Sequence, residues 1–221
     1  MRRVTYSRNF TISLSRTCRC YCKYCAFATH QPHLRTPDEV ETLLGDAEKR
    51  RAKELLILTG EAPDQHPKVL AQLNQLGHED FVDYVVWVSE RALERGILPH
   101  TNLGVMERRD MQRLREVTAS QGLMLESISE RLMETVHAGS PTKHPAERLR
   151  TIELAGELKV PYTTGILVGI GETPEERLAS LQAIAELHRR HGHIQEVILQ
   201  KFVPHPRYHG QDVGVIATDA A

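Results

Sequence analysis

Apolar and polar positions follow two different periods along this chain. Residues 9–14 alternate between polar and apolar side chains, which is typical of a strand with one buried face. Residues 54–58 are dominated by a continuous apolar run, as expected for a strand that is buried on both faces. The same criteria predict four more strands, at residues 98–104, 122–126, 162–168 and 196–200.

Helical patterns lie between these strands. The first opens at Pro37, with acidic residues in its first turn and basic residues near its end, an arrangement that suits the helix dipole. Further helices are predicted at residues 80–95, 107–120, 144–158 and 174–191. Six strand–helix repeats with short connections predict a parallel sheet, because each crossover helix returns the chain to the same edge. We therefore expect an α/β fold of the partial (β/α)₆ barrel type, with outer helices.

Composition narrows the classes of protein that fit. The 221 residues, 40% of them hydrophobic, are enough for one substantial core, and no linker divides them, so we expect a single domain over residues 1–221. The formal charge of −1, from 28 basic and 29 acidic residues, argues against a nucleic acid or an anionic membrane as partner. No apolar run approaches the ~18 residues of a membrane span, and no signal peptide is recognisable. We expect a soluble, cytoplasmic protein.

The cysteines carry the strongest chemical signal. All four fall within eight residues, so they cannot link distant parts of a fold by disulfides. The spacing Cys18-x3-Cys22-x2-Cys25 presents three thiolates, which suit an iron–sulfur cluster with one iron left open. Zinc is the alternative, with His30 or His33 as the fourth ligand. Cys20, the fourth thiol, is expected to be a spectator because three ligands already satisfy the cluster.

Other unusual residues also follow predicted strands, where chemistry collects in parallel α/β folds. They are Gly60-Glu61-Ala62-Pro63 after the second strand, Glu126-Ser127 after the fourth, and Gly169–Glu172 after the fifth. Two basic residues, Lys143 and Arg148, could hold a carboxylate or merely cover a helix face. Several polar residues near strand ends could line a substrate cavity: Asn102, Thr163, Thr164 and Gln200.

These motifs together resemble those of the radical S-adenosylmethionine (SAM) superfamily, whose fold is a partial (β/α)₆ barrel. The resemblance rests on the cysteine spacing with Tyr24 before the third cysteine, on Gly60–Pro63 as a GGE-type motif, and on Gly165–Glu172 as a GxIxGxxE motif. It implies a 4Fe–4S cluster on Cys18, Cys22 and Cys25, and SAM as second cofactor. The expected SAM-binding residues are Tyr24, Gly60, Glu61, Pro63, Glu126, Ser127, Gly165 and Gly169.

Each of these residues has an implied task. Glu61 would accept a hydrogen bond from the SAM ammonium, Glu126 or Ser127 would reach the ribose or the methionine end, and the backbone from Gly165 to Gly169 would lie along the adenine. In the superfamily the reduced cluster cleaves SAM to a 5′-deoxyadenosyl radical that abstracts hydrogen from the substrate. The cofactor supplies this chemistry, and the protein orients it.

A narrower resemblance covers about residues 5–209. Residues 10–13, 123–127, 161–172 and 192–197 are similar to the family of 7,8-didemethyl-8-hydroxy-5-deazariboflavin (FO) synthases. The resemblance implies ring closure in coenzyme F-420 biosynthesis, acting on the adduct of tyrosine and 5-amino-6-(D-ribitylamino)uracil. It also implies FO synthase subunit 2 as the partner that makes this adduct, and a one-electron donor. Members of the family continue well beyond the sixth strand, so we expect a core without their C-terminal extension.

Three alternatives remain open at this point. The chain could be the partner subunit of the same pathway, although residues 163–165 and 192–197 favour the ring-closing one. Biotin-synthase-like and thioether-forming radical SAM enzymes with an auxiliary cluster would need late cysteines, and none follows Cys25. A non-catalytic, zinc-stabilised α/β module is the third alternative.

Overall fold

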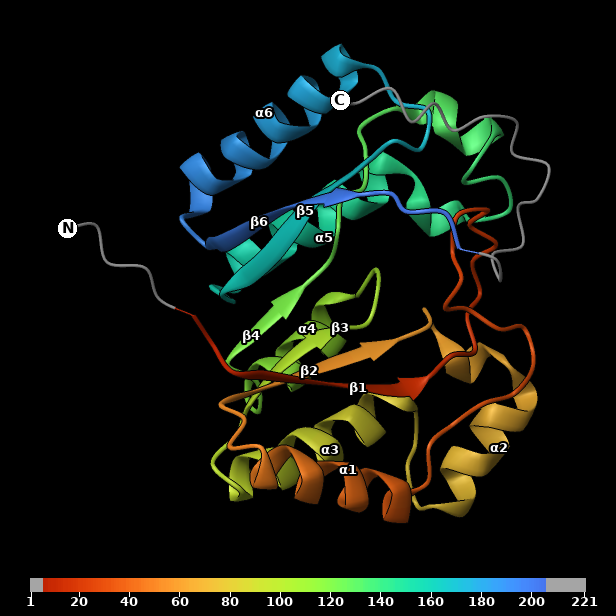
Figure 1. Cartoon of the computed structure of the whole chain (residues 1–221), viewed down its shortest axis with the longest axis vertical. Coiled ribbons are helices and arrows are strands. Elements are labelled where there is room, and N and C mark those ends of the chain that lie inside the picture. The colour runs from red at the N-terminus through yellow and green to blue at the C-terminus, as the bar shows by residue number, and fades with distance from the viewer. Residues whose placement is uncertain (1–5, 206–221) are drawn as a thin grey trace.

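Six parallel strands form one sheet in a computed structural model that describes residues 6–205. The strands lie in chain order from edge to edge, and their carboxyl ends point the same way (Figure 1). They are β1 (Asn9–Ser15), β2 (Glu54–Thr59), β3 (Leu98–Asn102), β4 (Ser120–Gly122), β5 (Tyr162–Val168) and β6 (Ile194–Lys201). Within residues 6–205, β1 and β6 do not pair with each other, so the barrel stays open.

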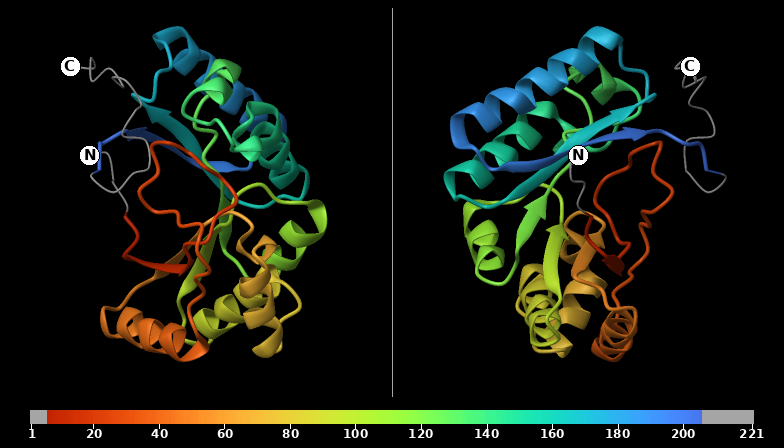
Figure 2. Two further views of the ribbon diagram at one scale, coloured as in Figure 1. Left: turned by 90° about the vertical axis from the view of Figure 1, so that its right-hand side faces the viewer. Right: turned by 60° about the vertical axis from the view of Figure 1, so that its left-hand side comes forward.

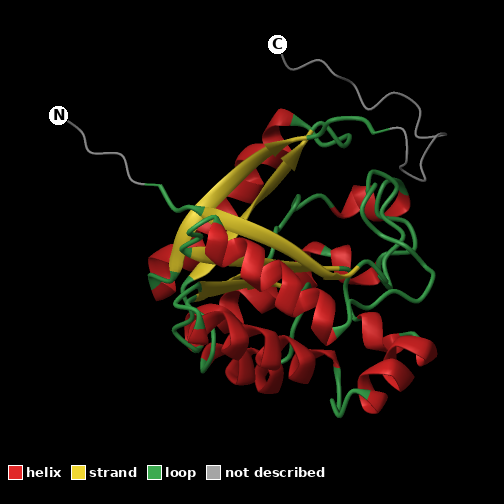
Figure 3. Cartoon of the chain, turned by 60° about the horizontal axis from the view of Figure 1, so that its bottom comes forward, coloured by secondary structure: helices red, strands yellow, loops and turns green. Residues whose placement is uncertain are grey.

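Helices cover the outer face of this curved sheet (Figures 2 and 3). They are α1 (Pro37–Lys49), α2 (Pro67–Gln75), α3 (Phe81–Glu94), α4 (Arg108–Arg115), α5 (Pro145–Glu157) and α6 (Pro174–His191), with short 3₁₀ helices η1 (Pro63–Gln65), η2 (Glu130–Glu134) and η3 (Pro141–Lys143). In the part of the chain described, no helix combines the length and apolar character needed to cross a membrane. The predicted α/β fold, an open partial (β/α)₆ barrel with outer helices, is confirmed.

Local signals explain where the helices begin. At α1 the Thr36 side chain accepts from the backbone N–H of Glu39, whose carboxylate accepts from the Thr36 N–H in return. Thr173 and Glu176 repeat this capping box at α6, which ends at Gly192 in the left-handed conformation. Both helices also have proline in the first turn, where its missing N–H costs no hydrogen bond.

Strand β2 is apolar on both faces, because one face packs in the core and the other lines the barrel interior. Leu55 and Ile57 are fully buried in the cluster of apolar side chains between sheet and helices. Leu56 and Leu58 point the opposite way and line a cavity inside the barrel. Because successive strand residues face opposite sides, a strand covered on both faces needs apolar residues at each position.

Several predicted boundaries are wrong. The fourth strand was expected at 122–126 but is Ser120–Gly122; beyond it the backbone follows β5 without a regular ladder, and Glu126 adopts a left-handed φ of 66°. The third strand ends at Asn102, two residues early, because Gly104 turns the chain at φ 98°. Of the helix expected at residues 107–120, only Arg108–Arg115 is helical, and this segment is α4. Helix α2 was not predicted at all, since its short pattern follows two proline-containing turns.

The loop after β1 is held against the end of β2 through Gly60. The Gly60 N–H donates to the Ser15 carbonyl at 2.8 Å, and the Arg19 N–H donates to the Glu61 carbonyl at 3.0 Å. A Cβ at position 60 would overlap the Thr17 carbonyl and lie 2.8 Å from the Cys18 Cβ. Glycine is therefore required here by close approach of two backbones.

We expect Gly60→Ala to lower the free energy of unfolding by about 1–3 kcal/mol, because the added methyl group forces the two loops apart. Urea unfolding followed by circular dichroism measures the change. Gly45→Ala in α1 is the matched control: a Cβ there meets nothing within 4 Å, so it should be neutral or stabilise the helix by up to about 1 kcal/mol. Equal effects of the two substitutions would contradict the close-approach explanation.

Candidate functional site

A cavity of about 200 Å³ opens at the carboxyl ends of the strands. It is lined by all four cysteines and by four of the eight other residues expected there, namely Tyr24, Gly60, Glu61 and Glu126. The rest of its lining includes apolar side chains from the cysteine loop and from the segment after β4, together with Asn102, Gly104, Lys143 and Arg148. Residues far apart in the chain thus converge on the cysteine loop.

The cysteine loop places one thiol where backbone donors stabilise it. Cys18 Sγ accepts hydrogen bonds from the N–H groups of Cys20 at 3.4 Å and Glu61 at 3.2 Å. A hydrogen bond from the Cys20 side chain, with these backbone bonds, lowers the pKa of the Cys18 thiol to about 7, despite partial burial. Thiolates rather than thiols bind metals, so Cys18 is prepared to act as a ligand. Cys18 and Cys25 are partly exposed, whereas Cys20 and Cys22 are buried.

Cys20 lies on the side of the loop that faces η3. Its sulfur is 3.1 Å from Thr142 Oγ1. Its interaction with Cys18 raises the pKa of the Cys20 thiol to about 11, so it stays protonated at neutral pH. Cys22 donates to Ser140 Oγ at 3.4 Å, and its pKa is raised, chiefly through its hydrogen bond with Cys20 and also by burial. Because the pKa of both thiols is raised, their protonation does not distinguish ligand from spectator, and the spectator role expected for Cys20 remains a prediction.

Glu61 brings an unpartnered acceptor into the cavity. Its side chain is only 8% exposed, and Oε1 has no hydrogen-bond partner. Oε2 lies 3.9 Å from Nη2 of Arg148, and Gly104 lies so close that a Cβ there would overlap the Glu61 carboxyl group. A buried carboxylate oxygen without a donor is costly unless a ligand supplies one. The site is therefore shaped to receive a hydrogen-bond donor, preferably a cation.

Glu126 and Lys143 form a buried ion pair beside Glu61. Lys143 Nζ lies 2.5 Å from Glu126 Oε1, with the two side chains 13% and 9% exposed. Burial by itself would raise the pKa of Glu126, but the charges of Lys143 and Arg148 lower it below its usual value. Arg148, 3% exposed, also donates to the Met124 carbonyl at 2.5 Å. Of the two roles left open for Lys143 and Arg148, the structure supports binding to carboxylates.

Tyr24 connects the cysteine loop to the segment after β4. Its hydroxyl lies 3.1 Å from Nε2 of His137, and Lys143 Nζ sits 5.7 Å from the centre of its ring. Burial lowers the pKa of His137 to about 3, so the imidazole is neutral, and burial raises that of the Tyr24 phenol well above its usual value. His137 was missed because a lone histidine in a loop carries no pattern that a sequence could reveal.

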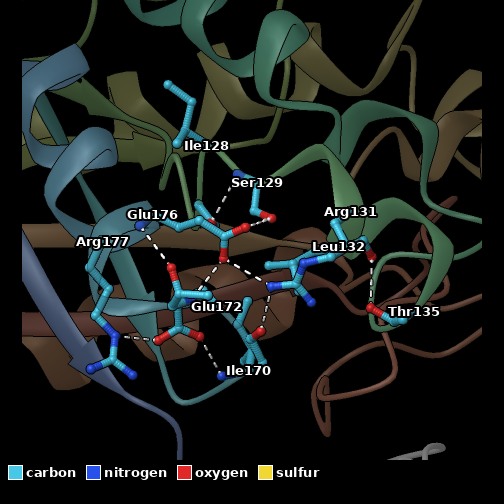
Figure 4. Close-up of polar contacts among 12 residues, drawn as sticks. Ile128, Ser129, Arg131, Leu132, Thr135, Ile170, Glu172, Glu176 and Arg177 are labelled. Carbon is cyan, nitrogen blue, oxygen red and sulfur yellow. Dashed lines mark hydrogen bonds and ion pairs between the residues drawn. The ribbon is translucent and has the colours of Figure 1, made fainter.

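The turn between β5 and α6 is organised by one carboxylate. Glu172 accepts from the N–H group of Ile170 at 2.8 Å and from Arg177 Nε at 2.6 Å (Figure 4), and also from the N–H group of Gly169 at 2.8 Å. Glu176 next to it accepts from Ser129 and Arg131 of the segment after β4 (Figure 4). The glutamate of the GxIxGxxE motif therefore stabilises the conformation of its own turn, by accepting hydrogen bonds from the backbone of that turn.

Four expected SAM-binding residues lie outside the lining of the cysteine cavity. Pro63 is buried at the start of η1, and Ser127 is buried with its hydroxyl accepting from the Ser129 N–H. Gly165 lies against the backbone of β6, where a Cβ would be 2.8 Å from the Met124 Cε. Gly169 is in the β5–α6 turn with a φ of 96°. Their assigned roles remain predictions.

The donor set fits a cluster better than a single zinc ion. Within residues 6–205, no three His, Cys, Asp or Glu side chains lie close enough to bind one metal ion. His33 Nδ1 accepts from the Arg16 N–H, and the His30 ring stacks on Tyr21. In a 4Fe–4S cluster each thiolate binds a different iron, so the three sulfurs need not converge on one point. The cavity suits such a cluster, because cysteines line it and because Gly60 and Gly104 have no side chains that would fill it.

Curated relatives share nearly all of this chain. It is 45% identical over 201 residues to a protein of Methanocaldococcus jannaschii named 7,8-didemethyl-8-hydroxy-5-deazariboflavin synthase. The protein of that name from Methanothermobacter thermautotrophicus is 47% identical over 206 residues. These alignments cover 90% and 92% of this chain but only 56% and 63% of the relatives. The chain therefore spans little more than half the length of the proteins it matches.

Solved structures agree on the fold. HydG, a maturase of the [FeFe]-hydrogenase, superposes with a TM-score of 0.74 at 19% identity, over 89% of this chain and 43% of its own. Methylornithine synthase (PylB) superposes with a TM-score of 0.69 at 18% identity, over 90% and 55%. The family model for the radical SAM superfamily matches residues 12–184, which include the cysteine loop, Glu61, Glu126 and the β5–α6 turn. On this match, which covers most of the chain, the protein belongs to the radical SAM superfamily.

Proposed function

We propose that this chain is the radical SAM core of a 7,8-didemethyl-8-hydroxy-5-deazariboflavin synthase. As a member of its superfamily it uses a 4Fe–4S cluster and SAM. The observation that carries the proposal is the cavity that the cysteines line together with Glu61, whose buried Oε1 has no hydrogen-bond partner. Identities of 43–47% to relatives of that name support this choice among radical SAM activities. Relatives with this name imply a small-molecule substrate.

Cys18, Cys22 and Cys25 would hold the cluster and leave one iron open. When bound, cluster and SAM together supply a radical that abstracts hydrogen from the substrate. The chain's own contribution is to hold the thiolates and exclude water. The hydrogen bonds from the Glu61 and Cys20 N–H groups to Cys18 Sγ favour its ionised form before any metal arrives.

The charged residues around the cavity match the charges of SAM. Glu61 Oε1 would accept from the SAM ammonium in a charge-assisted hydrogen bond. Arg148, whose buried Nε has no partner, and Lys143 would face the carboxylate of its methionine end. Glu126 would accept from the ribose, and Tyr24, fixed by His137, would bound the adenine side. Pro63, Ser127, Gly165 and Gly169 would shape the turns behind these contacts.

Several further features belong to the same proposal. The substrate would be the adduct of tyrosine and 5-amino-6-(D-ribitylamino)uracil, delivered by FO synthase subunit 2, with a separate one-electron donor. Residues 1–221 would act as one core domain in the cytoplasm, although residues 1–5 and 206–221 lie outside the described part. The partner-subunit and zinc-module alternatives are less well supported, because the matching relatives are named for the ring-closing synthase.

Anaerobic reconstitution tests this proposal. The chain is loaded with iron and sulfide, reduced, and given SAM with and without the adduct, and both 5′-deoxyadenosine and fluorescent deazaflavin are assayed. We expect both products. Deoxyadenosine without deazaflavin would keep the radical class but contradict the substrate. A chain that binds one equivalent of zinc and no sulfide would overturn the proposal altogether.

We expect Cys22→Ala to abolish SAM cleavage, because two thiolates cannot hold the cluster. Cys20→Ala is the matched control: it removes an equally buried thiol from the same loop and should leave iron and sulfide content unchanged. The measurements are iron and sulfide analysis and 5′-deoxyadenosine formation. Loss of the cluster in Cys20→Ala, with retention in Cys22→Ala, would show that a different set of thiols is used.

We expect Glu61→Gln to weaken SAM binding about tenfold to a hundredfold, because a hydrogen bond to a charged group contributes about 1.5–3 kcal/mol. Equilibrium dialysis with cluster-loaded protein measures the dissociation constant. Glu90→Gln, an exposed position on α3, is the control and should bind SAM as the wild type does. Unchanged affinity in Glu61→Gln would assign the ammonium to another acceptor.

A further inference from the structure

A second cavity, of about 430 Å³, occupies the open interior of the barrel. Its walls come from the inward faces of β1, β2, β3, β5 and β6. Asn102 and Met124 line both this cavity and the cysteine cavity, so the two are neighbours with a common wall. A ligand seated in the interior would therefore extend towards the cysteine loop.

The lining of the interior cavity combines polar and apolar side chains and contains no Lys or Arg. Its hydrogen-bonding residues are Asn9, Glu54, His100, Asn102, Thr163, Gln195, Glu196 and Gln200, with Leu56, Leu58, Met124 and Ile198 between them. Of the four residues expected to line a substrate cavity, three do so. Thr164 is the exception, because it points to the opposite face of β5 and is fully buried.

Two carboxylates line the cavity from opposite sides, one on β2 beside the edge strand β1 and the other on the edge strand β6. Glu54, at the start of β2, accepts from the Asn9 side chain at 3.1 Å. Glu196, on β6, lies 3.5 Å from Thr163 Oγ1. Neither has a basic partner among the ion pairs of residues 6–205, so both keep free acceptor capacity and negative charge.

His100 closes the floor between these two glutamates. It is 6% exposed, and Nδ1 lies 2.6 Å from Ser120 Oγ. Its Nε2 reaches towards Gly122, where a Cβ would be only 3.0 Å away, so this glycine makes room for the ring. Burial lowers the pKa of His100, against the opposing effect of Glu54 and Glu196. The imidazole is thus neutral and adds no positive charge to the cavity.

We propose that the interior cavity is a subsite for an uncharged polyol chain, and that Glu54 and Glu196 make it reject the phosphorylated form of the same chain. This assignment rests on the proposed function, whose product is a deazariboflavin and therefore carries a ribityl chain. Amide, hydroxyl, imidazole and carboxylate groups on several strands can each pair with one hydroxyl of such a chain.

The charge of the cavity decides between ligand classes. A phosphate placed here would be repelled by two carboxylates, and the lining offers no Lys or Arg to pair with it. A purely apolar chain would offer no donor to the remaining acceptor positions of the two carboxylates. A neutral chain rich in hydroxyl groups satisfies the acceptors and introduces no charge. It would also anchor the ring system in the neighbouring space, nearer the cysteine loop.

Fluorescence titration with three ligands tests this subsite on the cluster-loaded 221-residue chain. The ligands are 7,8-didemethyl-8-hydroxy-5-deazariboflavin, its ribityl 5′-phosphate, and an analogue with N-methyl in place of the ribityl chain. We expect each altered ligand to bind about tenfold more weakly or worse, since several hydrogen bonds are lost in one case and repulsion by two carboxylates is added in the other.

Two variants then separate charge from shape. Glu196→Gln and Glu54→Gln should each reduce the preference for the unphosphorylated ligand at least about threefold, because the carboxylate charge is removed while the size is kept. Glu116→Gln, at an exposed position following α4, is the control and should keep the full preference. Circular dichroism verifies that each variant is folded.

The outcomes distinguish this inference from the proposed function. If the chain forms deazaflavin but binds the ribityl and N-methyl ligands equally, the polyol subsite is wrong and the function stands. The subsite is equally wrong if the phosphate binds as well as the free polyol, or if neither glutamate variant changes the preference. If the chain cleaves SAM but neither forms nor binds any deazaflavin, the proposed function is wrong and the subsite with it.

Discussion

The contact between the cysteine loop and the end of β2 is the constraint on which the site depends. Gly60 lets the two backbones approach until the Glu61 N–H donates to Cys18 Sγ. That one approach sets the orientation of the first thiol and also aims the Glu61 side chain into the cavity. Parallel pairing of β1 and β2 brings the two loops to the same edge, and the missing side chain at position 60 lets them touch.

Around that contact, the cysteine cavity is lined by buried side chains of opposite charge. Glu126 pairs with Lys143, and Arg148 lies between the Met124 carbonyl and Glu61. Each carboxylate is stabilised, yet Glu61 Oε1 and Arg148 Nε remain without partners. The cysteine cavity thus has both signs of charge, as a zwitterionic ligand needs, whereas the interior cavity has only negative charge. The two neighbouring cavities therefore differ in the charge of the ligand that each can accept.

The cysteine spacing, the GxIxGxxE motif and most strands were predictable because their signals are local. Alternation in β1 and the apolar run in β2 follow from burial of one or two faces. The boundary of β4 was not predictable, since Glu126 adopts a left-handed conformation that only its buried pairing with Lys143 and its contacts with β5 sustain. Tyr24 was expected at the site, but its hydrogen bond with His137 could not be predicted, because 113 residues separate the two in the sequence.

The sequence by itself determined the parallel α/β architecture and the radical SAM type of cysteine loop, and it predicted that Glu61 lies beside that loop. Tertiary structure alone decided that Lys143 and Arg148 point inward, that Thr164 does not line the interior, and that Glu54, His100 and Glu196 meet in one cavity. The physical reason is that periodicity and motif spacing depend on neighbours in the chain. Burial, charge pairing and cavity shape depend on which distant strands the sheet brings side by side.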